Sequence, residues 1–194
     1  MAKLESTMKN MVLSLTLIAL VASGLLGAVY ALTKEPIETT NRNDKEKAIK
    51  DVLPDKSAIV GSPKEISMEG YADPFVIYPA TLNGQLIGAT VETYDNNGYG
   101  GKIKIMVGLK LDGSISDYHI LETSETPGLG AKAEDWFRDK GNIRDKNPET
   151  TKFSPTKDGG DIDAITASTI TSRAFLTAVQ KAYEAFKEYQ NTNK

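Results

Sequence analysis

The sequence predicts an α+β fold, with an antiparallel meander sheet packed with helices behind one N-terminal transmembrane helix. Three patterns carry this prediction: an uncharged stretch near the N-terminus, alternating apolar residues in the middle of the chain, and an amphipathic stretch near the C-terminus. We expect four segments in order: a short cytoplasmic segment (1–9), a transmembrane anchor (10–33), a linker helix (34–56) and an extracytoplasmic domain (57–194).

No charged residue occurs from Asn10 to Thr33, and roughly 20 apolar residues suffice to cross a hydrocarbon core of about 30 Å. A cleaved signal peptide is the alternative, because "AVYA", which ends at Ala31, has the small residues of a cleavage site. The stretch exceeds the apolar region of a signal peptide, about 7–15 residues, which favours an uncleaved single-pass anchor. Lys3 and Lys9 precede it, so we expect the N-terminus in the cytoplasm and the domain on the extracytoplasmic (periplasmic) side of the cytoplasmic (inner) membrane.

The segment after the anchor predicts a short, charged helix. Pro36 suits a first helical turn, and Pro54 ends the pattern. Ala48, Val52 and Leu53 give this helix only a thin apolar edge. We therefore expect a solvated spacer between the membrane and the domain.

Two hairpins predict the sheet. "FVIYPATL" and "QLIGATVETY" flank Asn83–Gly84, a two-residue turn in which both positions need a positive φ. Asp112–Gly113 joins "KIKIMVGLKL" to "SISDYHIL" in the same way. In "KIKIMVGLKL" apolar residues alternate with other residues, and the predicted apolar face comprises Ile103, Ile105, Val107, Leu109 and Leu111. We expect an antiparallel meander with one buried face.

The last element, from about Thr171 to Tyr189, predicts an amphipathic helix packed on the sheet. Its apolar side chains recur at spacings of three and four, at Phe175, Val179, Tyr183 and Phe186.

Composition excludes several classes of chemistry. The chain of 194 residues has no cysteine, so disulfides, thiolate nucleophiles and iron–sulfur ligation are excluded. Its single histidine, His119, lies in a strand pattern with no glycine elbow near any serine, which argues against a Ser–His–Asp hydrolase. A net charge of −3 without a basic cluster argues against a nucleic-acid partner. Chemistry must therefore use carboxylates, hydroxyls or a bound organic cofactor.

The stretch "AITASTITSR" holds five hydroxyl residues at the start of the last helix: Thr166, Ser168, Thr169, Thr171 and Ser172. A helix N-terminus leaves about four N–H groups without partners, and Ser and Thr are favoured caps there. The same terminus also suits a phosphate. Two interpretations stay open: the hydroxyls are only caps, or one of them is esterified by a bound phosphate.

Two glycine-containing stretches leave similar alternatives. "NNGYGGK" is either a loose loop or a place where the backbone approaches a ligand closely. "ETPGLG" is either a plain turn before a helix or a wall against which a flat ring lies.

Together these motifs resemble one family. "GYGGKIKIMVGLKLDG", "ETPGLG" and "DAITASTITSRA", in this order behind one transmembrane helix, resemble the FMN-binding domain family and, within it, the G subunit of the Rnf electron-transport complex. The C subunit of the Na⁺-translocating NADH:quinone oxidoreductase, usually a longer chain, is similar too. The resemblance implies an electron-relay flavoprotein subunit of a membrane ferredoxin:NAD oxidoreductase that moves Na⁺ or H⁺. An anchored FMN-binding sensory or regulatory module and a flavin-free binding domain are the alternatives.

The resemblance also implies a covalent cofactor. In this family a flavin transferase joins the phosphate of FMN to a threonine through a phosphoester, and the attachment motif places that threonine at Thr169. Ala167 and Ser168 stand where the motif commonly has glycine and alanine. Ser168 is therefore a second, less favoured ester site. Other membrane subunits of the complex are the implied partners.

The remaining expected FMN contacts follow from the same resemblance, and no catalytic residue or metal site is implied, because the subunit relays electrons rather than turning over a substrate. The expected contacts around the ring and the attachment point are Tyr99, Gly100, Gly101, Glu125, Thr126, Gly128, Leu129, Thr166, Ser168, Ile170 and Thr171. Lys132 is either a contact of the phosphate or ribityl chain or a solvated lysine.

Overall fold

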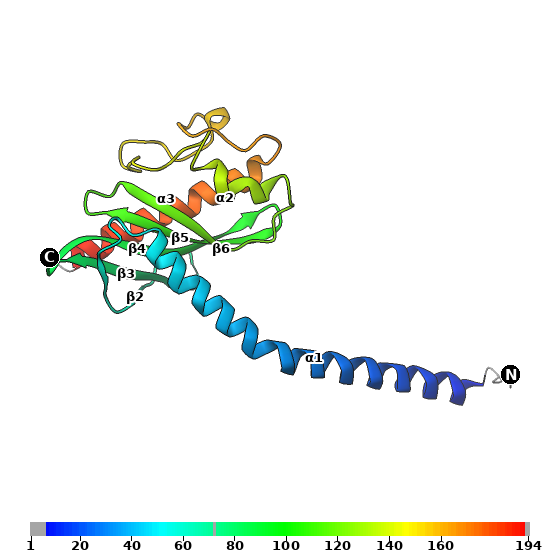
Figure 1. The fold of residues 1–194 in the computed structure, drawn as a ribbon. Coiled ribbons are helices and arrows are strands. Elements are labelled where there is room, and N and C mark those ends of the chain that lie inside the picture. The colour runs from blue at the N-terminus through cyan, green and yellow to red at the C-terminus, as the bar shows by residue number, and fades with distance from the viewer. Residues whose placement is uncertain (1–6, 72, 193–194) are drawn as a thin grey trace. The chain divides into compact units, whose positions relative to one another are not determined.

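A long N-terminal helix precedes an antiparallel sheet with helices against it in the computed structural model, which describes residues 7–71 and 73–192 (Figure 1). The predicted α+β class is confirmed. The chain divides into two units, one up to Asp44 and the other from Lys45 to Lys194. Lys3, on which the expected orientation partly depends, lies outside the described residues.

The N-terminal helix α1 spans Met8–Asp51 (Figure 1). It is the one helix of the described residues that is long and apolar enough to cross a membrane. The helix runs through Pro36 instead of ending and beginning again there. Proline lacks the N–H that would bond the carbonyl four residues earlier, so α1 continues with that one bond missing.

The predicted meander is confirmed in the sheet. Its strands are β1 (Ile59–Val60), β2 (Lys64–Ile66), β3 (Phe75–Leu82), β4 (Gln85–Gly98), β5 (Gly101–Lys110) and β6 (Ile115–Glu122). They lie in the order β1-β3-β4-β5-β6, with β2 also paired to β3, and every pairing is antiparallel.

The turn between β3 and β4 has the chemistry that its sequence predicts. Asn83 has φ 52° and Gly84 has φ 79°, and the flanking Leu82 and Gln85 pair directly. Leu111 departs from the prediction, since it follows the end of β5 and is 51% exposed instead of lying on the buried face.

The helix α3, Thr169–Thr192, covers one face of the sheet (Figure 1). Phe175 and Val179 are completely buried, and the ring of Phe175 stacks on Phe137 with centroids 4.3 Å apart. Thr93 of β4 donates a hydrogen bond of 3.0 Å to the carbonyl of Ala178. These contacts hold α3 on the sheet. The helix begins at Thr169, two residues before the expected start.

The prediction of one buried face is wrong, because the end of α1 covers the other face. Ala48 and Val52 are completely buried and pack with Met106 of β5. Gly108 lets the backbone approach, since a methyl group there would lie 1.7 Å from the carbonyl oxygen of Val52. Ser116 donates a hydrogen bond of 2.6 Å to that same oxygen. Residues 45–53 therefore belong to the folded unit and are not a solvated spacer.

A buried carboxylate also holds this end of α1. Glu92 of β4 is 6% exposed, its carboxylate lies 2.6 Å from the ammonium of Lys45, and Lys104 of β5 forms a second ion pair with it. Burial disfavours the charge of Glu92, but the hydrogen bonds from Lys104 and Lys45 outweigh burial and hold the pKa of this carboxyl below its usual value.

Candidate functional site

Three segments that are far apart in the sequence meet at the start of α3. They enclose a hollow of about 580 Å³ lined by Tyr99, Glu125, Thr126, Leu129, Gly130, Ala167, Ser168, Thr169, Ile170 and Thr171. This volume is within the range of roughly 300–1,000 Å³ that is common for small-molecule sites. The hollow therefore contains residues from all three motifs that the sequence singled out. Of the expected contacts, Gly100, Gly101, Gly128 and Thr166 do not line it.

Glu125 joins the three segments. Its side chain is buried, at 7% exposure. One carboxylate oxygen accepts a hydrogen bond of 3.0 Å from the N–H of Gly100, and the other accepts one of 2.7 Å from the hydroxyl of Thr171. Because both oxygens already have partners, the first role of Glu125 is to hold the loop after β4 against α3.

The glycines around Glu125 make room for its carboxylate. A methyl group at Gly130 would lie 2.3 Å from one carboxylate oxygen, and one at Gly98 would lie 2.7 Å from the other. At Gly100 the obstacle is the carbonyl of Ser124, at 2.2 Å. The sequence offered two explanations for the glycines of "NNGYGGK", a loose loop and a close approach to a ligand. The structure adds a third, which is close packing around the buried carboxylate of Glu125.

The "ETPGLG" stretch forms a tight turn that exposes an apolar side chain. Gly128 has φ 77°, a left-handed conformation that glycine adopts without strain. The N–H of Leu129 bonds the carbonyl of Thr126 at 3.1 Å, and the short helices η1 (Gly130–Lys132) and α2 (Ala133–Trp136) follow.

Three exposed apolar side chains stand around the hollow. Tyr99 is 73% exposed, Ile170 48% and Leu129 43%. Each comes from a different one of the three segments, so the cluster depends on the fold. A flat apolar ring is the kind of ligand that such side chains can cover.

The structure separates the five hydroxyls of the "AITASTITSR" stretch. Ser172 accepts a hydrogen bond of 2.9 Å from the N–H of Ile165 and donates one of 3.0 Å to the carbonyl of Ser168. Thr171 is committed to Glu125. Thr171 and Ser172 therefore stabilise the fold, which leaves Thr166, Ser168 and Thr169 at the surface or in the hollow.

Among these three, Thr169 is the residue that lines both hollows at the start of α3. Thr166 is exposed in a turn, and Ser168, the residue before the helix, is buried at 8% exposure. Thr169 is half-buried, and it lines both the first hollow and a second one beside it.

Ala167 has a left-handed backbone with φ 61°. An L-residue in this conformation costs roughly 1–2 kcal/mol, whereas the glycine of the family motif adopts it freely. With alanine instead of glycine at this position, the chain still makes the turn before α3, but the backbone of Ala167 is strained.

The second hollow is polar and has a volume of about 570 Å³. It is lined by Trp136, Lys140, Thr156, Lys157, Asp163, Ala164, Ile165, Thr166, Ala167 and Thr169. The ammonium of Lys157 donates a hydrogen bond to the hydroxyl of Thr169. No sequence pattern pointed to Lys157, because it lies in a turn-rich loop with other charged residues. Lys132, the lysine considered from the sequence, lines neither hollow.

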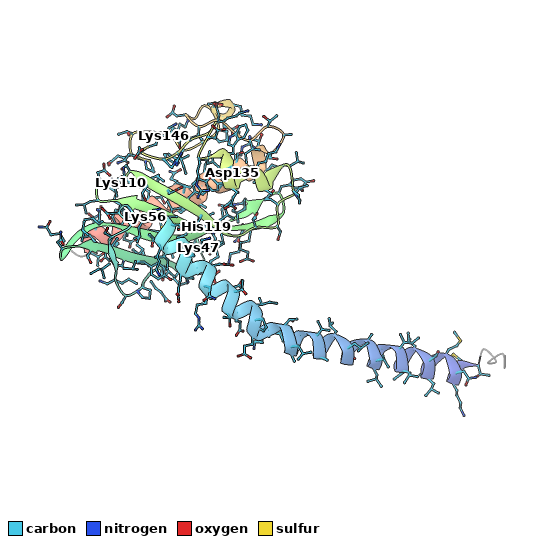
Figure 2. The ribbon with its side chains drawn as sticks, in the orientation of Figure 1. Lys47, Lys56, Lys110, His119, Asp135 and Lys146 are labelled. Carbon is cyan, nitrogen blue, oxygen red and sulfur yellow. The ribbon has the colours of Figure 1, made fainter. Side chains whose placement is uncertain are left out.

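His119 lies apart from this site, on β6 (Figure 2). It pairs with Met106, whose side chain faces the end of α1, so His119 points to the sheet face opposite to α3.

Two family profiles match the chain. Residues 98–184 match the FMN-binding domain, and residues 1–52 match the RnfG N-terminal region. The first match begins at the end of β4 and includes every residue that lines either hollow.

Several curated relatives match most of the chain. The G subunit of the ion-translocating oxidoreductase complex of Aliivibrio fischeri is 35% identical over 95% of this chain and 93% of its own length. The G subunit of the Na(+)-translocating ferredoxin:NAD(+) oxidoreductase complex of Acetobacterium woodii is 33% identical over 94% and 91%. The corresponding G subunit of Vibrio cholerae is 31% identical over 92% and 90%.

Proposed function

We propose that this chain carries FMN as an electron relay in a membrane-bound complex. The chain belongs to the family of G subunits of ion-translocating oxidoreductase complexes, which supports the proposal. The observation that carries the proposal is the hollow at the start of α3, with apolar side chains around it and the hydroxyl of Thr169 at its edge. The relatives named above match over most of their length and are G subunits, which favours this complex over the NADH:quinone oxidoreductase with its C subunit.

The residues of the hollow fit FMN. FMN combines a flat apolar ring system with a polar chain that ends in a phosphate. Tyr99, Leu129 and Ile170 offer apolar surface for the ring. The start of α3 offers Thr169 for the phosphate end, together with the backbone N–H groups that the first turn of a helix leaves without intrahelical partners.

We propose that FMN is attached covalently to Thr169. The Oγ–phosphorus bond forms as a phosphoanhydride bond of a flavin dinucleotide breaks, the nucleoside monophosphate leaves, and the hydroxyl proton passes to a base of a flavin transferase. The resemblance of the attachment motif assigns the bond to Thr169. In support, Thr169 lines both hollows, whereas Thr171 and Ser172 are held in buried hydrogen bonds and Ser168 is buried.

The bound flavin supplies redox chemistry, and the chain supplies its position. Glu125 holds the loop after β4 against α3 and so fixes the position of one side of the hollow relative to the other. Leu129 and Ile170 exclude water from the surface that they cover. No residue of the hollow is required to act as an acid or a base in this role.

We propose that α1 holds the domain at the cytoplasmic membrane, with residues 1–9 in the cytoplasm and the domain on the extracytoplasmic side. A covalent bond prevents loss of FMN where no cytosolic pool can replace it. Electrons then pass between cofactors of neighbouring subunits, and the complex couples their transfer from ferredoxin to NAD to movement of Na⁺ or H⁺.

The test is expression of the full chain with and without a flavin transferase, followed by a denaturing gel viewed under ultraviolet light. We expect a fluorescent band only with the transferase, and none for Thr169→Ala. Ser168→Ala is the matched control, and it should keep the fluorescence. A dark wild-type band in the presence of the transferase overturns covalent attachment, and a fluorescent Thr169→Ala band overturns the choice of residue.

A further inference from the structure

We propose that Lys157 is the cation that pairs with the phosphate on Thr169 and positions the Thr169 hydroxyl for attachment. This inference rests on the proposed covalent attachment and adds a residue to it. Its starting observation is the hydrogen bond that Lys157 donates to the Thr169 hydroxyl within the polar hollow.

The loop that carries Lys157 is held against α3 at the neighbouring residue. Asp158 forms two hydrogen bonds with the guanidinium of Arg173, both of 2.7 Å. Thr169 and Arg173 are one turn apart on the same face of α3. Consecutive residues of the loop, Lys157 and Asp158, therefore face consecutive turns of the helix, which fixes the ammonium beside the hydroxyl.

The loop is also ordered by its own backbone. It forms the short helix η2, Thr156–Asp158, which ends at Gly159 with φ 77°. The N–H of Thr156 bonds the carbonyl of Ile162 at 2.9 Å, next to the bridge between Pro155 and Ile162. Lys157 thus extends from a turn that is closed on both sides, which limits how far its ammonium can move.

The other cations near Thr169 have different partners. Arg173 is occupied by Asp158, and the ammonium of Lys140 lies over the ring of Trp136, 5.4 Å from its centroid. Lys132 lines neither hollow. Lys157 is the cation that the fold directs at the acceptor oxygen.

A cation in this place acts both before and after attachment. The attacking oxygen gains negative charge as its proton leaves, and an adjacent ammonium stabilises that charge. The phosphodiester that results keeps one negative charge, which pairs with the same ammonium and with the N–H groups at the start of α3.

The experiment compares three variants of the full chain, Lys157→Gln, Lys157→Arg and Lys152→Gln, each incubated in membranes with a flavin transferase and a flavin dinucleotide. Lys152 is the matched control, because it is an exposed lysine of the same segment that lines neither hollow at Thr169. We expect Lys157→Gln to incorporate flavin about tenfold more slowly. Lys157→Arg should stay within about threefold of the wild type, and Lys152→Gln should match it.

A second readout separates positioning from a folding defect. After long incubation, the loaded proteins are compared by ³¹P NMR in detergent. Loss of the paired ammonium should shift the phosphodiester resonance in Lys157→Gln and leave it in place in Lys152→Gln. An unchanged rate or an unchanged resonance in Lys157→Gln overturns the role of Lys157. If the wild type itself takes up no covalent flavin, the proposed attachment fails first.

Discussion

Two of the buried carboxylates of the domain, Glu92 at 6% exposure and Glu125 at 7%, have different kinds of partner. Two lysine ammoniums neutralise Glu92 beneath the end of α1. A backbone N–H and a hydroxyl hold Glu125, and neither carries a net charge.

This difference matches the structural roles of the two carboxylates. The two ion pairs of Glu92 fasten the end of α1 and β5 to β4. Neutral donors hold Glu125 at the wall of the proposed flavin site. Four measurements test whether the two carboxylates differ in this way.

The largest effect is expected from Glu125→Ala. The change leaves the N–H of Gly100 and the hydroxyl of Thr171 without their partner and opens a void, so we expect a loss of about 3 kcal/mol in the free energy of unfolding. Chemical denaturation of the detergent-solubilised chain measures it. Glu188→Ala, which removes an exposed carboxylate from α3, is the control and should change stability by less than about 0.5 kcal/mol. Equal effects of both variants would contradict the structural role of Glu125.

Glu92→Gln should cost less, about 2 kcal/mol. The two lysines lose their anion, but their side chains are about one-third exposed and regain part of the loss from water. The same denaturation experiment measures the loss. A more stable Glu92→Gln protein would show that desolvation of the carboxylate outweighs its two ion pairs.

The ion pairs of Glu92 also predict a dependence on pH. The pKa of Glu92 is held below its unfolded value of about 4.5, so its contribution is present above that pH and disappears as pH falls through the folded pKa. The stability difference between wild type and Glu92→Gln should therefore shrink below about pH 4.5 and stay constant from about pH 6 to 8. Denaturation curves at a series of pH values measure it. A difference that grows as pH falls would refute this sign.

The smallest effect is expected from Thr171→Val, about 1 kcal/mol, since it removes one hydrogen bond and keeps the shape of the side chain. Thr171→Ser keeps the hydroxyl and is the matched control. Thermal unfolding in detergent should separate the two by roughly 2–4 °C. If both variants melt together, the hydroxyl contributes little to holding Glu125.

Several elements of the fold could be predicted because their signals are local. Asn83–Gly84 specifies its own turn, since few residue pairs tolerate two positive φ values. The spacing of Phe175 and Val179 specifies the buried side of α3 in the same way. The sequence did not predict that the end of α1 packs on the sheet, because Ala48 and Val52 form only a thin apolar edge. Their burial depends on Met106 and Gly108, which are distant in the sequence.

The candidate site shows the same division. The order of the three motifs pointed to Thr169, Glu125 and Leu129, which the structure brings to one hollow, while their contacts with FMN stay predictions. The role of Gly130 and the position of Lys157 had no pattern to reveal them.

The amino-acid sequence was enough to establish the apolar anchor, the hairpins, the amphipathic last helix and the family to which the motifs belong. These features depend on residues within a few positions of one another, or on motifs that family members share. The folded chain was needed to learn which hydroxyls are free, which cation faces Thr169 and what Glu125 holds. Those answers depend on contacts such as Glu125 to Thr171, 46 residues apart, and packing alone sets such distances.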